Sequence, residues 1–141
     1  QLNLRTGSAQ LVSLPLAAGD FPCHDRRHTG LRTDTLLMLG HDHHVPEGAF
    51  GFNTVQRLDR RRQQVTGFSY GAHALAEEHL LVPRPGGAEG TGWVVGTVYD
   101  WRARQTRLSV FDAEHLADGP LAQASLPYAL PLGLHGQFVA A

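Results

Sequence analysis

The alternation of apolar and polar residues predicts short β-strands along most of the chain. Brief apolar runs predict strands at residues 36–39, 65–70, 80–82 and 123–126, and residues 50–58 alternate less regularly. Residues 93–99 and 106–111 form the clearest predicted hairpin, and residues 2–16 predict another with a turn at Thr6-Gly7. The only helical pattern is a weak one at residues 112–116. The sequence therefore predicts an all-β fold.

Three of the predicted hairpin tips resemble one another. They lie at residues 4–7, 58–61 and 99–102, and so recur every 40 to 55 residues or so, the length of a propeller blade. A β-sandwich would produce similar hairpins, so both architectures stay open on this pattern alone.

Composition narrows the range of functions. The 141 residues suffice for one domain, and a formal net charge of -1 gives no electrostatic footprint for nucleic acid. Cys23 stands alone, which excludes an internal disulfide and suits a cytoplasmic protein. No apolar run approaches the roughly 18 residues of a membrane span. Because the chain opens on Gln1 with a predicted strand, we expect sequence to precede it.

One histidine stands in an unusual setting. His135 is preceded by Gly133-Leu134 and followed by Gly136, so the backbone there can adopt conformations that other residues avoid. A neutral imidazole in such a setting can bind iron, copper or zinc. Alternatively, its ring bonds a backbone carbonyl in a tight turn, since one ligand does not make a metal site.

Two carboxylates beside apolar stretches could support such an imidazole. Asp20 precedes Phe21-Pro22, and Glu78 precedes the run that ends at Pro83. A carboxylate that accepts a hydrogen bond from a metal-bound imidazole fixes its tautomer and orientation. The alternative is that each is an ordinary surface carboxylate at the start of a strand.

Other candidates carry less weight. His41, His43 and His44 resemble a metal-binding tract, but a solvated loop explains them as well. We interpret residues 23–29 as a loop, and Cys23 as a small residue without a catalytic base.

Four segments, in this order, resemble the C-terminal third of the carotenoid cleavage oxygenase family. They are DFPCHDRRHTG at residues 20–30, EHLLVPRPG at 78–86, GWVVGTVYD at 92–100 and LPYALPLGLHG at 126–136. The stretches at 108–113 and 116–122 and the closing G-x-H-G-x-F pattern also fit. This family includes carotenoid and lignostilbene dioxygenases and retinal pigment epithelial membrane protein.

The resemblance implies a seven-bladed β-propeller, of which residues 1–141 would be the C-terminal blades of a single domain whose N-terminal blades are missing here. It implies a non-haem Fe(II) ion, Fe(2+), held by four histidines, with three glutamates that orient three of the rings. The implied reaction is cleavage of a C=C bond of a carotenoid, apocarotenoid or stilbene by O2. His135 would be the last iron ligand, and Glu78 and Asp20 would be orienting carboxylates.

The sequence departs from the family pattern at two positions and in one larger respect. Asp20 stands where the family usually has glutamate, and its side chain is one methylene shorter. His79 stands where the family tends to have proline, beside Glu78. The other three iron ligands would lie outside this chain, so we expect the isolated chain to be inactive and the complete enzyme to contact membranes peripherally. The alternative function is a non-catalytic β-sandwich or propeller binding module.

Overall fold

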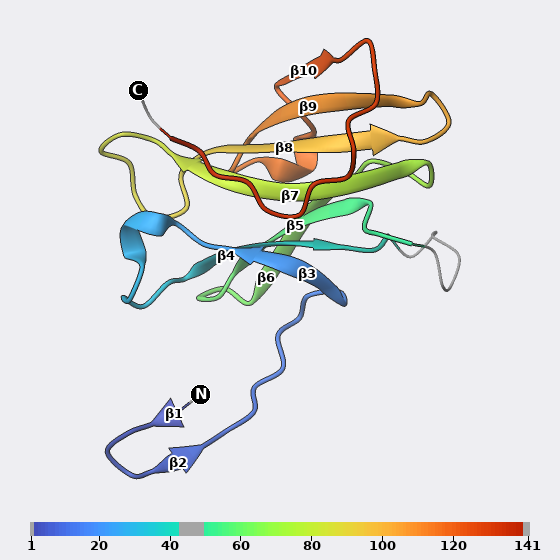
Figure 1. Ribbon diagram of the computed structural model, residues 1–141. Helices are drawn as coiled ribbons and strands as arrows, with labels where there is room; N and C mark the ends of the chain where they lie inside the picture. The colour runs from blue at the N-terminus through green and yellow to red at the C-terminus, as the bar shows by residue number, and fades with distance from the viewer. Residues whose placement is uncertain (1, 43–49, 140–141) are drawn as a thin grey trace.

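The computed structural model describes residues 2–42 and 50–139, which form two stacked antiparallel sheets and one small hairpin (Figure 1). The first sheet contains β3 (Gly19–Cys23), β4 (Thr35–Gly40), β5 (Thr54–Asp59) and β6 (Gln64–Ser69). The second contains β7 (Ala74–Pro83), β8 (Gly92–Asp100), β9 (Gln105–Asp112) and β10 (Ala122–Ser125). The hairpin pairs β1 (Leu2–Asn3) with β2 (Ser8–Ala9).

Each four-stranded sheet is a meander, in which consecutive strands are neighbours. The core lies between the sheets, where the side chains that point inward from each sheet meet. These include Leu37, Leu39, Val55, Ala76, Leu81, Val94 and Phe111. Two consecutive meanders that stack face to face are the arrangement expected of adjacent propeller blades. The prediction of an all-β chain is thereby confirmed.

The three hairpin turns share one local structure. Each contains an Asx residue whose Oδ1 accepts two backbone N–H groups, and these residues are Asn3, Asp59 and Asp100. The fourth residue after each Asx has positive φ, and these residues are Gly7, Gln63 and Arg104. The structural repeat is offset from the sequence repeat, because the Asx residue precedes residues 4–7 in the first turn but lies within residues 58–61 and 99–102 in the other two.

Several predicted element boundaries were wrong. Residues 11–16 form no strand, and β5 begins at Thr54 rather than at Phe50. Residues 112–115 are not helical, and of the predicted helix only Leu116 lies in a helical element, the 3-10 turn η2 (Leu116–Asp118). The segment at residues 23–29, interpreted as loop, ends β3 and then contains the 3-10 turn η1 (Arg26–His28). Residues 80–82 are the end of the ten-residue strand β7.

A polar contact also joins the two sheets. Asp25, which is fully buried, accepts hydrogen bonds from the Arg27 side chain and from the backbone N–H of Gly90. The guanidinium of Arg27 also donates to backbone carbonyls of residues 84, 87 and 88 in the loop between β7 and β8. Hydrogen bonds from Arg27 lower the pKa of Asp25 to about 2, so this carboxylate is ionised at neutral pH.

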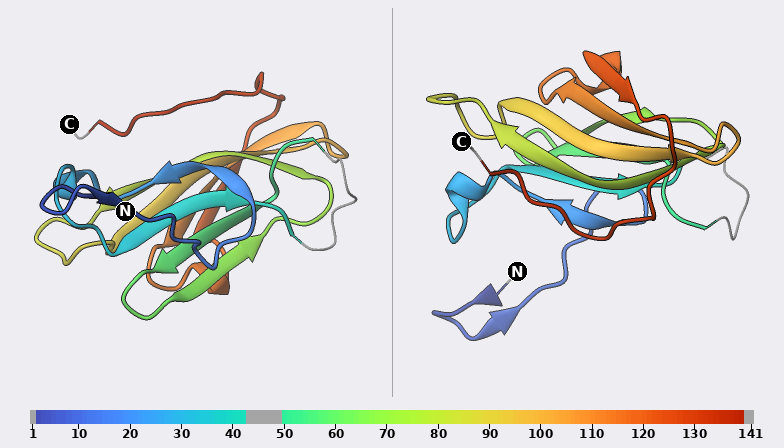
Figure 2. Two further views of the ribbon diagram at one scale, coloured as in Figure 1. Left: turned by 90° about the horizontal axis from the view of Figure 1, so that it is seen from below. Right: turned by 45° about the horizontal axis from the view of Figure 1, so that its top comes forward.

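After β10 the chain runs back across the sheets as an extended tail, residues 127–139, with no regular secondary structure. The tail passes over β7 and beside β3, which are the first strands of the two sheets (Figures 1 and 2). Among the described residues, no helix has the length and apolarity needed to cross a bilayer.

Candidate metal centre

A β-bulge in β7 directs two adjacent carboxylates toward the tail. Ala76 pairs with Val98 and His79 pairs with Gly96. Glu77 and Glu78 are therefore both opposite one residue of β8, Thr97. Side chains of successive residues in a regular strand point to opposite faces, whereas the extra residue of a bulge re-aims one of them. Glu77 and Glu78 therefore both reach the tail.

His135 lies next to Glu78, as expected from the sequence. Its Nδ1 is 3.5 Å from Glu78 Oε1, and the ring of Phe21 lies 5.6 Å from the imidazole, centre to centre. The His135 side chain is 78% exposed, whereas that of Glu78 is 14% exposed. Because Nδ1 faces the carboxylate, Nε2 on the opposite side of the ring points away from Glu78 and is free to meet a group from outside this chain.

The two carboxylates also hold the tail on both sides of His135. Glu77 Oε1 accepts the backbone N–H of Gly133 at 2.6 Å, and Glu78 Oε2 accepts that of Gly136 at 2.6 Å. The second oxygen of Glu77 accepts the hydroxyl of Thr97 from β8. Hydrogen bonds to a carboxylate are stronger than those between neutral groups. The tail around His135 is therefore bound at two fixed points.

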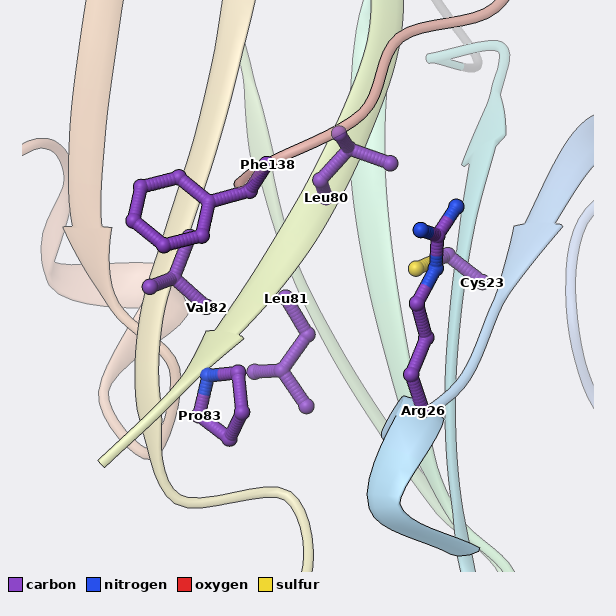
Figure 3. A pocket seen from close by; sticks show the side chains of 7 residues that line it. All are labelled: Cys23, Arg26, Leu80, Leu81, Val82, Pro83 and Phe138. Atoms are coloured by element: carbon purple, nitrogen blue, oxygen red, sulfur yellow. The ribbon is translucent and has the colours of Figure 1, made fainter. Parts of the chain in front are cut away.

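The last residues of the tail pack on the end of β7. Phe138 lies over Leu80 and Val82 at one side of a pocket of about 260 Å³, and Cys23 and Arg26 line its opposite side (Figure 3). Burial raises the pKa of the Cys23 thiol, which disfavours the reactive thiolate. This agrees with the interpretation of Cys23 as a non-catalytic residue.

A second pocket, of about 320 Å³, opens on the other side of His135. Its lining is mainly apolar and includes Phe21, Phe50, Phe52, Leu75, Leu132 and Leu134. Binding sites for lipophilic molecules have this composition.

Asp20 occupies a different position from Glu78. It lies exposed at the start of β3, and its Oδ1 accepts the backbone N–H of Phe21 at 2.7 Å. Phe21 has a positive φ of 57°, a conformation that this short hydrogen bond supports. The structure thus brings Glu78 to His135 but does not bring Asp20 to it.

The described residues do not by themselves form a metal site. Nowhere in residues 2–42 and 50–139 do three His, Cys, Asp or Glu side chains come together as a ligand set. His41 packs against Phe52, with ring centres 5.1 Å apart, and His43 and His44 lie outside the described residues. An exposed imidazole with a carboxylate 3.5 Å from its Nδ1 fits one ligand of a histidine-rich centre, and the remaining ligands would have to come from elsewhere.

Sequence reasoning missed two parts of this site. The role of Glu77 depends on the bulge, which no local pattern reveals. His79 was noted only as a departure from the family pattern beside Glu78, whereas it lies in the bulged strand and is 2% exposed. The one available signal was the run of three polar residues at 77–79 inside an apolar stretch.

The family model described as retinal pigment epithelial membrane protein matches residues 1–140. The chain belongs to this family. It is the carotenoid cleavage oxygenase family expected from the sequence, and its relatives include a carotenoid 9,10(9',10')-cleavage dioxygenase of Arabidopsis thaliana, 27% identical over 99% of this chain. A resveratrol cleavage oxygenase of Chaetomium globosum is 41% identical over 45% of the chain.

Solved structures give the same result. Apocarotenoid oxygenase of Synechocystis, in a mutant form, superimposes with a TM-score of 0.81 at 26% identity over 87% of this chain. A cobalt-substituted form of that enzyme matches with a TM-score of 0.80. The expected fold, blades of a β-propeller, is confirmed by these matches. The chain spans 26% of the Synechocystis structure, 27% of the Arabidopsis relative and 11% of the Chaetomium relative.

Proposed function

We propose that this chain is the C-terminal part, residues 1–141, of the single propeller domain of an iron-dependent oxygenase that cleaves a C=C bond with O2. The observation that carries the proposal is the contact between His135 and Glu78, held on a tail that two glutamates bind. The family membership and the named cleavage activities of the relatives support it.

In this proposal each residue has a defined task. His135 would offer Nε2 to Fe(II), while Glu78, 3.5 Å from Nδ1, would accept the Nδ1 hydrogen and so keep the ring in the required tautomer. Asp20, on the neighbouring strand β3, would orient a histidine ring that this chain does not carry. Iron bound to histidine nitrogens supplies the redox chemistry that O2 requires.

The substrate class follows from the relatives and from the apolar pocket. Their names include carotenoid, apocarotenoid and resveratrol cleavage, and all these substrates are lipophilic and conjugated. Phe21 and the tail residues Leu132 and Leu134 line the pocket beside His135 and would contact such a substrate. Phe50, 79% exposed, and Leu134, 71% exposed, extend this apolar surface outward, which would suit peripheral contact with a membrane.

The isolated chain would be inactive because one imidazole does not retain Fe(II). We expect the chain alone, supplied with ferrous iron, to show no cleavage of an apocarotenal or a hydroxystilbene. We expect the complete protein that contains this chain to retain iron and to cleave one of these substrates.

The decisive substitution is His135→Ala in the complete protein. Iron content and cleavage should both be lost, and Glu78→Gln should lower metal affinity by about 10- to 100-fold. His115→Ala is a matched control, because His115 is 67% exposed and its Nδ1 also lies 3.5 Å from a carboxylate, that of Asp112. If His135→Ala keeps its iron as well as His115→Ala does, the proposal is wrong.

A further inference from the structure

The bulge that positions Glu77 and Glu78 is itself held by a buried side chain. Among the described histidines only His79 is buried, and it directly follows the two glutamates in β7. Its Nδ1 lies 2.7 Å from the backbone carbonyl of Glu77, inside the bulge. A carbonyl only accepts, so Nδ1 carries the hydrogen and donates it.

The other ring nitrogen is fixed as well. Nε2 lies 2.8 Å from the hydroxyl of Tyr70, and because Nδ1 holds the hydrogen, Nε2 accepts the hydroxyl hydrogen. Burial lowers the pKa of His79 to about 4, so the ring is neutral at physiological pH and keeps this arrangement.

The two hydrogen bonds of the His79 ring run in one direction, toward the bulge. Tyr70 donates to His79, and His79 donates to the carbonyl of Glu77. Consecutive hydrogen bonds of one direction polarise and strengthen one another. Tyr70, which directly follows β6 of the first sheet, is thus linked through His79 to the bulge in the second sheet.

Gly96 in β8 provides the space for this ring. It pairs with His79 in the ladder, and a Cβ at position 96 would lie 2.4 Å from the Cγ and Nδ1 atoms of the imidazole. The ring therefore occupies the place where any other residue would put its side chain. His79 and Gly96 act as a fitted pair opposite the bulge.

We propose that His79 is a positioning residue of this site, which fixes the bulge at Glu77–Glu78 and thereby the two carboxylates that hold the tail on either side of His135. The extra residue of a bulge lacks a regular ladder partner, and the Nδ1–H of His79 supplies a donor to its carbonyl. The consequence for metal binding rests on the proposed function, whereas the positioning itself does not.

Two variants at position 79 test this by NMR on the 141-residue chain without metal. His79→Phe keeps an aromatic ring but removes both hydrogen bonds, and His79→Asn keeps an N–H donor near the position of Nδ1. In His79→Phe we expect the amide hydrogens of Gly133 and Gly136 to exchange about tenfold faster or more, the equivalent of one lost charge-assisted hydrogen bond. The Nδ1–H tautomer of His135 should also lose its preference. His79→Asn should retain most of both signals.

Core amides separate this result from general unfolding. Val55 and Val94, both fully buried, should keep their protection in a folded variant. If His79→Phe does not fold, Tyr70→Phe decides, because removal of the hydroxyl that holds Nε2 should speed exchange at the same two glycines. The proposal is overturned if a folded His79→Phe, or Tyr70→Phe in its place, leaves both glycine amides unchanged.

The proposed function can fail independently. Should the glycine amides respond as expected while the complete His135→Ala protein keeps its iron, the positioning role stands and the metal role of His135 falls. Should His135→Ala lose iron while the glycine amides never respond, the metal role of His135 stands and the positioning role of His79 falls.

Discussion

A neutral histidine in a protein core makes stability depend on pH in a defined window. His79 is 2% exposed, and burial lowers its pKa to about 4, against an ordinary value of 6.5. Between these two pH values the His79 ring is protonated in the unfolded chain but stays neutral in the folded chain. The free energy of unfolding should therefore fall as the pH falls through this window. The contribution of the neutral His79 to stability is complete above pH 6.5.

The size of this effect can be tested by urea unfolding at several pH values between 7 and 4. The full difference in pKa corresponds to a loss of about 3 kcal/mol, at about 1.4 kcal/mol for each pH unit of the window. His79→Asn, which has no ionisable group at this position, should lack this loss. The carboxylates with lowered pKa, such as Asp25, act mainly below pH 4 and stay outside the window. Parallel pH curves for the two proteins would contradict the prediction.

At the scale of elements, the paired strands β7 and β8 place the site. The bulge allows Glu77 and Glu78 to face the tail together, and Gly96 admits the ring that holds the bulge. Position 79 in β7 and position 96 in β8 should therefore be energetically coupled, and this coupling can be measured.

Gly96→Ala should destabilise the chain because its Cβ would lie 2.4 Å from the His79 ring. We expect a loss of about 1–3 kcal/mol in the free energy of unfolding, typical of an overpacked core. In a His79→Ala background the ring is absent, and the same substitution should cost much less. A double-mutant cycle from four urea titrations measures this coupling. Equal costs of Gly96→Ala in both backgrounds would show that the ring and the glycine are independent.

The same strands show how far the sequence predicts the fold. β8 and β9 were located from their runs of β-branched and aromatic residues, and the structure buries alternate positions of β8, among them Val94 and Val98. β7 was located only at its end, because the bulge shifts the phase of the alternation and leaves polar residues at 77–79 in succession. A period-two pattern cannot represent a residue that has no partner.

The candidate site was predictable only in part, for a related reason. His135 and Glu78 were selected from flanking glycines and from the family resemblance, and the structure places them 3.5 Å apart. The contribution of Glu77 required the path of the tail, which depends on hydrogen bonds to residues 56 and 58 positions earlier in the chain. The tail has no regular pattern of its own, so its course follows from tertiary contacts alone.

At the scale of the molecule, the site depends on how the two sheets are held together, because β3 and β7 belong to different sheets. An apolar core joins them, and so does the ion pair of the buried Asp25 with the partly exposed Arg27, in which Oδ2 and a guanidinium nitrogen lie 2.7 Å apart. Arg27 reaches the loop between β7 and β8 through three backbone carbonyls. The position of Phe21 beside His135 therefore depends in part on this polar contact.

Asp25→Asn should weaken the polar contact that holds the two sheets together. The substitution removes the charge that organises Arg27 while the amide stays buried, so we expect a loss of about 2–3 kcal/mol in the free energy of unfolding. Arg62→Ala breaks an ion pair at the exposed tip between β5 and β6, where Arg62 is 76% exposed, and should cost less than about 1 kcal/mol. Urea unfolding of both variants at pH 7 measures the difference.

The contact between Phe21 on β3 and His135 on the tail connects the two sheets. Asp25→Asn should therefore also change the ring signals of Phe21 and His135 in NMR spectra, whereas Arg62→Ala should not. Equal stability losses, or unchanged ring signals in Asp25→Asn, would mean that the apolar core alone sets the relation of the sheets.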